Sequence, residues 1–479
     1  MNSLFRGNRA GDGTGVNGEG GGLFVSGIGV SGPVTITDNF FESNRGGATG
    51  RGGGLALREP YSGTLVSSNI FSDNLAGVSG MGGGLYQDGN GFAVYRVNKL
   101  MGNACRIPFS GGGGGGVALS ETRARFEDVL VQDNSCTVGG GFHISGSTSV
   151  VTLTKSAILS NTADLFGGGI YVRNGQLTVR EASVKTNRGA LYGLTLRGGG
   201  GFFARDADVH IDHSVFQRNV GVNDFSGREP AVGGGLAFLG GQAHLDANLI
   251  LTNTAWISSA GEIGWGGGLF ISGTQASLTN NVIAGNKAEI GDGIYTQDSE
   301  MHALHTTIAD HAGQGVFVGP DATARLTNTI VSSNGLGITT TLPAGTTLPD
   351  HTLFWNNGED GVTGTDPIWG DPMFLDPAKW DYHLGYSSAA VDAGAVVSVT
   401  DDMDGQVRPI GLGYDIGADE LCWDVTDDGQ VSASDIEEVS LHWNQPTEDN
   451  WRYDLDGDGN IDVVDIQLMA SHWLEACNR

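Results

Sequence analysis

The stretch "FFESNRGGATGRGGGLAL", residues 40–57, contains two short motifs that recur along this chain and decide its fold. An alternating run ends in Asn44, and a cluster of three glycines then precedes the apolar Leu55. The glycine cluster begins at residues 20, 52, 82, 114, 139, 167, 199, 233 and 266, with reduced forms at 291 and 313. Spacings of 22 to 34 residues are typical of a repeat architecture.

The asparagine motif has the same period as the glycine cluster. Its members are Asn8, Asn44, Asn74, Asn103, Asn134, Asn161, Asn187, Asn219, Asn253, Asn286 and Asn334, and His311 takes the place of one more. Each repeat contains two or three short strands and no helical pattern, so one unit cannot bury its apolar face alone. Stacking the units predicts a parallel β-solenoid with coils about 4.8 Å apart. The asparagines should then form a row that is hydrogen-bonded from coil to coil.

These paired motifs resemble the repeats of the polymorphic outer-membrane protein family and, more loosely, pectate-lyase-like β-helices. The resemblance implies an all-β fold, a right-handed parallel β-helix over residues 1–334. It does not fix an activity, because such repeats occur in adhesins and in glycan-cleaving enzymes. The first residues, "SLFRGN", match the middle of a coil, and "MNSLFRGNRAGDG" lacks a signal peptide's apolar region. We therefore expect a fragment of a longer exported protein.

Composition and charge argue against nucleic acid as a partner and against a membrane-spanning segment. The chain has 479 residues, 81 of them glycine, and a net charge of −29. Phosphate binding needs clustered Lys and Arg, so this charge argues against nucleic acid as a partner. No apolar stretch approaches the roughly 20 residues that span a bilayer. Residues 421–479 carry fourteen Asp or Glu and two Arg, which is −12 of the −29.

The four cysteines fall into two pairs. Cys105 and Cys136 each lie two residues after a ladder asparagine, so they occupy equivalent positions on consecutive coils. Stacked coils bring their Cα atoms within the roughly 4.4–6.8 Å that a disulfide requires. Cys422 and Cys477 bracket the acidic tail. We predict both disulfides, which imply an oxidising compartment, the alternative being buried reduced thiols.

Residues 335–420 read as the last coils and a C-terminal cap. The segments "DPMFLDPAKWDYHLGYSSAAVDAG" (371–394) and "DDMDGQVRPIGLGYDIGADE" (401–420) resemble the closing segment that follows bacterial β-helix repeats. The match departs at Ala389, where the pattern has proline. Asp402, Asp404, Asp415 and Asp419 could be catalytic, but aspartates that accept hydrogen bonds within turns are the favoured interpretation.

The tail contains two twelve-residue acidic loops, "DVTDDGQVSASD" (424–435) and "DLDGDGNIDVVD" (454–465). A calcium loop takes oxygen ligands at positions 1, 3, 5, 7, 9 and 12 and requires glycine at position 6. Gly429 and Gly459 hold that position here. The predicted metal ligands are Asp424, Thr426, Asp428, Gln430 and Asp435 in the first loop, and Asp454, Asp456, Asp458, Asn460 and Asp465 in the second. The expected cofactor is Ca²⁺, at two sites.

Duplicate loops, each followed by one helix and ending in Asp, make residues 421–479 resemble a type I dockerin. This resemblance implies an EF-hand-like α-helical calcium module that docks onto a cohesin of a scaffold protein. Loop positions 10 and 11, which help choose the partner in that family, are Ala433 and Ser434 in the first loop, and Val463 and Val464 in the second. The two halves differ here, which puts the family's dual binding orientation in question.

Catalytic candidates are weak. The chain has no nucleophile elbow, zinc-protease helix or phosphate-binding loop. In "RDADVHID" (205–212), alternation sends Asp206, Asp208, His210 and Asp212 outward. His244 and Asp246 hold the same offsets one coil later, and His302 matches His210 further along. This patch of His and Asp residues could bind a metal or cleave glycosidic bonds, but a solvated sheet face is the favoured interpretation.

We therefore expect an extracellular or cell-surface β-helix protein for adhesion or polysaccharide binding, tethered through a calcium-dependent dockerin to a cohesin partner. The lack of a catalytic motif favours a protein without enzymatic activity. The alternative is a pectate-lyase-like polysaccharide lyase or glycoside hydrolase, and a third possibility is a structural spacer.

Overall fold

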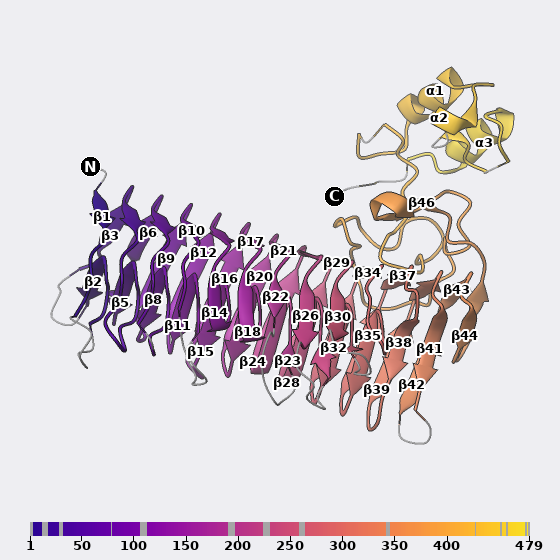
Figure 1. Ribbon diagram of the computed structural model, residues 1–479. Coiled ribbons are helices and arrows are strands. Elements are labelled where there is room, and N and C mark those ends of the chain that lie inside the picture. The colour runs from indigo at the N-terminus through magenta and orange to yellow at the C-terminus, as the bar shows by residue number, and fades with distance from the viewer. Residues whose placement is uncertain are drawn as a thin grey trace.

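The computed structural model describes residues 3–11, 18–27, 32–77, 79–105, 113–189, 197–223, 230–257, 264–341, 345–426, 428–450, 453–456, 458–474 and 477. These residues form an elongated stack of parallel strands, with the first strands at one end and the helices at the other (Figure 1). The expected all-β right-handed parallel β-helix with a small helical module is confirmed.

The first sheet runs along the whole stack and takes one short strand from each coil. Every neighbouring pair in it is parallel and in register. Its strands are β1 (Leu4–Arg6), β4 (Phe40–Glu42), β7 (Ile70–Ser72), β10 (Lys99–Met101), β13 (Leu130–Gln132), β17 (Ala157–Leu159), β21 (Ser183–Lys185), β25 (Val215–Gln217), β29 (Leu249–Leu251), β34 (Val282–Ala284), β37 (Thr307–Ala309), β40 (Ile330–Ser332), β43 (Leu353–Trp355) and β45 (Ile368–Trp369).

The second sheet contains two parallel rows of strands joined by β24 (Phe202–Asp212) and β28 (Leu236–Asp246), which belong to both rows. The row that follows the glycine clusters also holds β2 (Leu23–Ser26), β5 (Leu55–Arg58), β8 (Leu85–Asp88), β11 (Val117–Ser120), β15 (Phe142–Ser145), β19 (Ile170–Arg173), β32 (Leu269–Ser272), β35 (Ile294–Gln297), β38 (Gln314–Val318), β41 (Leu336–Thr340) and β44 (Glu359–Gly361). The other row also holds β3 (Thr35–Thr37), β6 (Thr64–Ser67), β9 (Phe92–Arg96), β12 (Arg123–Glu127), β16 (Val150–Thr154), β20 (Gln176–Arg180), β33 (Gln275–Thr279), β36 (Glu300–Leu304), β39 (Thr323–Thr327) and β42 (Thr346–Asp350).

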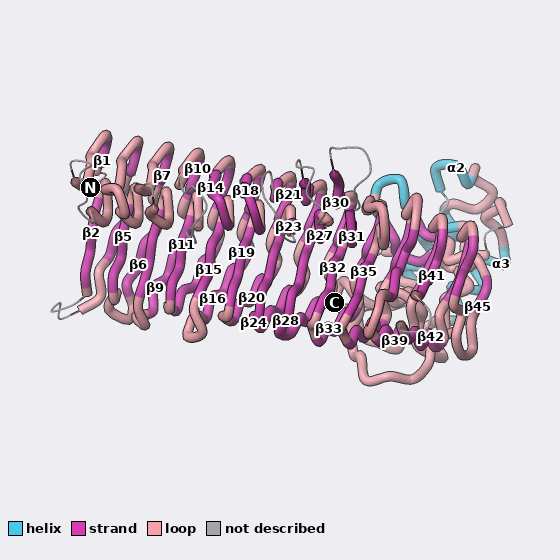
Figure 2. Tube along the Cα trace, turned by 60° about the horizontal axis from the view of Figure 1, so that its bottom comes forward, coloured by secondary structure: helices cyan, strands magenta, loops and turns pink. Residues whose placement is uncertain are grey.

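A third, shorter sheet covers the middle of the stack, as the tube view also shows (Figure 2). Its strands are β14 (Ser135–Val138), β18 (Thr162–Phe166), β22 (Arg188–Gly189), β23 (Arg197–Gly198), β26 (Val220–Asn223), β27 (Ala231–Val232), β30 (Thr254–Ile257) and β31 (Gly264–Trp265). After the coils come an antiparallel pair, β46 (Phe374–Asp376) and β47 (Asp381–Leu384), around a 3₁₀ turn, η1 (Pro377–Lys379). The helices are α1 (Ala433–Leu441), α2 (Thr447–Asn450) and α3 (Val463–Ser471).

The glycine clusters allow adjacent coils to approach each other and align the core. Gly52 has a φ of +66°, and a Cβ on Gly53 would collide with the carbonyl oxygen of Gly83 in the next coil. The apolar residue after each cluster points inward and pairs with its equivalent on the neighbouring coil. This fully buried row contains Leu55, Leu85, Val117, Phe142, Ile170, Phe202, Leu236, Leu269, Ile294, Val316 and Ile338.

The predicted asparagine row is confirmed as a continuous ladder. Asn134 donates from Nδ2 to Oδ1 of Asn161 at 3.0 Å, and Asn161 donates to Asn187 at 3.0 Å. From Asn44 onward, each ladder amide also donates to a backbone carbonyl, as Asn161 does to Val131 at 2.9 Å. His311 replaces one amide, and its Nδ1 lies 2.8 Å from Oδ1 of Asn334. The ladder therefore satisfies buried polar groups in every coil.

The cap and the helical module pack against each other and against the last coils. One apolar cluster contains Ile330 and Leu353 of the coils together with Val425 and Leu455 of the module. Trp423 stacks on His472 with ring centroids 3.9 Å apart. None of the described helices is long and apolar enough to cross a membrane.

Candidate functional site

The first acidic loop gathers its carboxylates around a common point. Ligand oxygens of Asp424, Asp428 and Asp435 lie within 4.8 Å of one another. Oδ2 of Asp424 accepts the amide of Gly429 at 2.6 Å, and Oδ1 of Asp435 accepts both the amide and the hydroxyl of Thr426 at 3.0 Å. Gly429 has a φ of +94°, a conformation that glycine adopts without strain. These contacts hold the oxygen-rich loop in a closed turn.

The second loop repeats this arrangement. Oxygens of Asp454, Asp456 and Asp465 lie within 4.8 Å of one another, and Gly459 has a φ of +89°. Oδ2 of Asp454 accepts the amide of Gly459 at 2.9 Å, whereas its Oδ1 is shielded from solvent and accepts no hydrogen bond among the described residues. Burial raises the pKa of Asp454, and the neighbouring carboxylates of Asp465, Asp456 and Asp458 raise it further. A cation would satisfy that oxygen and offset the repulsion.

Each loop ends inside the first turn of a helix, which fixes the last carboxylate. Ser432 caps α1 and forms a capping box with Asp435, and Asp462 caps α3 in the same way with Asp465. The carboxylates of Asp435 and Asp465 are thus both buried and oriented by backbone amides. The predicted ligands Gln430, Asp458 and Asn460 lie at the solvent side of their loops.

The outer patch of His and Asp residues lies on β24 and β28. His210 pairs with His244 and Asp212 with Asp246 in register, and the two imidazole rings stack with centroids 4.6 Å apart. His302 lies in the same row two coils further on, separated from His244 by Ser277. The structure therefore brings the two histidines together and leaves His302 apart.

Asp212 and Asp246 differ from the histidines because other groups partly cover them. Nε of Arg180 lies 3.0 Å from Oδ2 of Asp212, and burial raises the pKa of Asp212 while Arg180 opposes the shift. Burial also raises the pKa of Asp246, and the Asp401 carboxylate of the cap raises it further. The cap reaches this point through Asn280, whose Nδ2 donates to the carbonyl of Asp401 at 3.0 Å.

The cap aspartates accept hydrogen bonds in turns. Asp402 accepts the amides of Asp404 and Gln406 at 2.9 and 2.8 Å. Asp415 accepts the amides of Asp392 and Leu421, both at 2.7 Å. The contacts of Asp402 and the contact of Asp415 with Leu421 close local turns, whereas the contact with Asp392 joins two segments of the cap that are 23 residues apart.

The sequence reasoning missed a cavity beneath the cap. This cavity has a volume of about 230 Å³ and is lined by His213, Trp380, Tyr382, His383 and Asp404, among others. His383 lies between two carboxylates, with Nδ1 2.5 Å from Asp381 and Nε2 2.6 Å from Asp404. Burial opposes protonation, but these partners raise the pKa of His383 to about 10. The sequence "DYH" (381–383) does not by itself indicate that the chain returns over the coils and encloses a cavity there.

The cysteines form two disulfides. Cys105 and Cys136 join consecutive coils with Cα atoms 4.9 Å apart. Cys422 and Cys477 join the two ends of the helical module, with Cα atoms 5.8 Å apart. The first bond reinforces the stack, and the second closes the module on itself.

Comparison with known proteins identifies the helical module. Residues 423–474 match the family described as the dockerin type I domain. These residues form a dockerin type I domain, and such domains bind calcium and imply a cohesin partner. The match covers both acidic loops together with α1 and α3.

Two solved structures are distantly similar to this chain. No curated protein sequence matches the chain. One similar solved structure is the mannuronan C-5 epimerase AlgE6 A-module of Azotobacter vinelandii, at 12% identity and a TM-score of 0.32, covering 71% of this chain and 92% of that one. The AlgE4 A-module of the same organism has 14% identity and a TM-score of 0.27, covering 71% and 89%. At this level of similarity, the activity of neither protein can be assigned to this chain.

Proposed function

We propose that this protein is an extracellular or cell-surface β-helix that binds polysaccharide or a surface glycan and is attached through its dockerin to a cohesin-bearing scaffold. The observation that carries the attachment is the dockerin type I domain at residues 423–474. We propose a division into repeats (1–334), last coils and cap (335–420) and dockerin (421–479). The two disulfides support an oxidising location.

The proposal includes two calcium ions. Asp424, Thr426, Asp428, Gln430 and Asp435 would hold one, and Asp454, Asp456, Asp458, Asn460 and Asp465 the other. When bound, calcium neutralises the carboxylates and contributes its binding free energy to folding of the module. Gly429 and Gly459 turn each loop, and the capping boxes at Ser432 and Asp462 orient the last carboxylates.

The outer face of the second sheet suits an extended polar ligand. A shallow groove of about 320 Å³ crosses three coils and is lined by Gln242, His244, Gln275, Ser277, Glu300 and His302, among others. These side chains provide hydrogen-bond donors and acceptors at the regular spacing of the coils. Long stacked faces are the binding surfaces of solenoid proteins in general.

Calcium-dependent capture by a panel of type I cohesins tests the attachment. We expect the full chain to bind at least one cohesin in millimolar calcium and to lose binding in excess EDTA. Asp465→Ala should weaken binding, whereas Asp321→Ala, at an exposed position in the coils, should not. Failure to bind any cohesin in calcium, or equal binding in EDTA, would refute this function. A glycan array then identifies the ligand of the β-helix.

The second candidate function is cleavage of an acidic polysaccharide. The cavity under the cap favours it, because His213, His383 and Asp404 lie there beside the aromatic rings of Trp380 and Tyr382. Incubation with uronate polysaccharides tests this candidate through absorbance from unsaturated ends for a lyase and through reducing-sugar release for a hydrolase. Activity that survives alanine at His210, Asp212, His244 and Asp246 would clear the outer patch of a catalytic role.

A further inference from the structure

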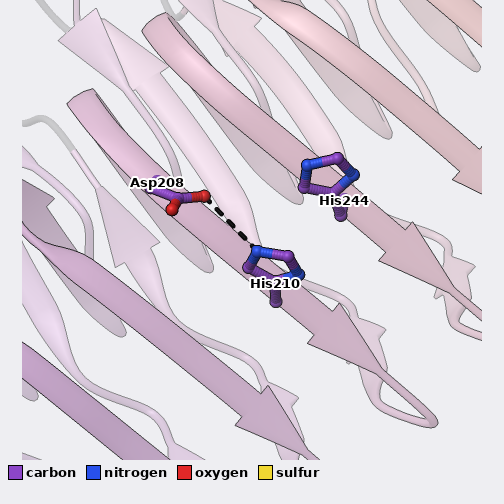
Figure 3. A group of neighbouring side chains, drawn as sticks. All are labelled: Asp208, His210 and His244. Carbon is purple, nitrogen blue, oxygen red and sulfur yellow. Dashed lines mark ion pairs between the residues drawn. The ribbon is translucent and has the colours of Figure 1, made fainter.

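We propose that Asp208, His210 and His244 form a binding site for a divalent transition-metal ion of the zinc class on the outer face of the β-helix. One ligand atom from each residue lies within 4.8 Å of the other two. Figure 3 shows that Asp208 and His210 come from one strand and His244 from its neighbour, with all three side chains on the same side. The site is separate from the calcium loops and does not depend on the attachment function.

The backbone holds these three donors in a fixed arrangement. Asp208 and His210 are two residues apart on β24, so alternation places them on the same face. His244 on β28 is the register partner of His210. These two strands have eleven residues each, whereas every other described strand has at most five. The donors lie in the second half of each strand, beyond the left-handed residues Asp206 and Gly240. There the register pairs continue without a break as far as Asp212 and Asp246, and this regular pairing supports a metal site.

The donor set selects the kind of ion. Two imidazoles and one carboxylate suit Zn²⁺, Co²⁺, Ni²⁺ or Cu²⁺, whereas Ca²⁺ and Mg²⁺ prefer oxygen ligands. The side chain of His210 is 53% exposed, so an ion can reach it from solvent. Three protein ligands leave room for water or a further ligand on the metal.

One oxygen of the Asp208 carboxylate has no hydrogen-bond partner among the described residues. Oδ1 of Asp208 lies 3.4 Å from Nε2 of His210, is shielded from solvent, and makes no hydrogen bond with the described residues. A bound cation would satisfy this oxygen without any rearrangement of the strands. The stacked rings place the second imidazole beside the first, with centroids 4.6 Å apart.

His302 supplies a matched control in the same chain. It lies on the same outer face, in the same row as His210 and His244, but Ser277 separates it from His244. Its Nε2 lies 3.2 Å from Glu300, so it also has a neighbouring carboxylate. His302→Gln therefore removes a comparable exposed histidine without touching the three proposed ligands.

Titration of the full chain with CoCl₂ in saturating calcium, followed by visible d–d absorption, tests the site. We expect saturable binding in the wild type, unchanged affinity in His302→Gln, and a loss of at least about 100-fold in His210→Gln and His244→Gln, since even outer-shell partners contribute about 10–100-fold. Asp208→Asn should also weaken binding. Circular dichroism should show all variants folded, because these side chains are on the surface. Absence of saturable binding, wild-type affinity in His210→Gln, or an equal loss in His302→Gln would each overturn the proposal.

Discussion

Replacing Asn161 with alanine tests the ladder that holds the coils in register. Its amide donates to Oδ1 of Asn187 at 3.0 Å and to the carbonyl of Val131 at 2.9 Å. Its Oδ1 accepts both the side-chain and backbone N–H groups of Asn134 at 3.0 Å. The substitution thus removes four hydrogen bonds at a site with no solvent exposure.

The expected loss follows from those four bonds. Each contributes about 1 kcal/mol net, and the buried partners left behind find no water, so we expect a loss of about 4 kcal/mol in the free energy of unfolding. Urea unfolding followed by circular dichroism measures this loss. Asn90→Ala is the control, because Asn90 is exposed and its side chain accepts a single long contact among the described residues, from Thr148 at 3.4 Å. A loss below about 1 kcal/mol, or an equal loss in the control, would refute the reasoning.

Three further substitutions test other parts of the structure. Burial lowers the pKa of His311 from 6.5 to about 4, so the folded state resists protonation and the free energy of unfolding falls as the pH drops below about 6.5. His311→Asn should therefore reduce the loss of stability between pH 7.5 and pH 5 by about 2 kcal/mol. A urea midpoint with the same pH dependence in this variant as in the wild type would contradict this expectation. The double substitution Cys105→Ser and Cys136→Ser should lower the free energy of unfolding by about 3–4 kcal/mol, because the disulfide closes a loop of 31 residues. If the double variant has the same urea midpoint as the wild type measured without reductant, the bond is not formed. Arg408→Met breaks the fully buried ion pair with Glu420, whose charged atoms lie 2.7 Å apart, and should lower the free energy of unfolding by about 3–5 kcal/mol. The control Arg325→Met, at an exposed position, should have little effect. Equal urea midpoints for the two variants would refute a structural role for the pair.

The sequence predicted what repeats locally and missed what depends on distant chain segments. The Asn44 row could be predicted because each member ends an identical short motif. A second row, in which Asn39 donates to Asn69 at 3.0 Å and Asn69 to Asn98 at 3.1 Å, was overlooked although an asparagine precedes each of these strands. Serine and other residues replace asparagine in the middle of that second row, which weakens the signal.

The surroundings of the outer patch could not be predicted in the same way. Alternation correctly placed His210 and Asp212 on one face. It could not show that the cap returns to Asn280 from 121 residues further along the chain and partly covers Asp246. The cavity beneath the cap has the same origin, since His213 and His383 meet only through the tertiary fold.

Calcium titration of the full chain by calorimetry tests most directly whether the acidic tail is the attachment module. The two loops share the same spacing, glycine turn and capping box, so we predict two bound calcium ions per chain. A stoichiometry of one, or no binding at all, would contradict the central claim.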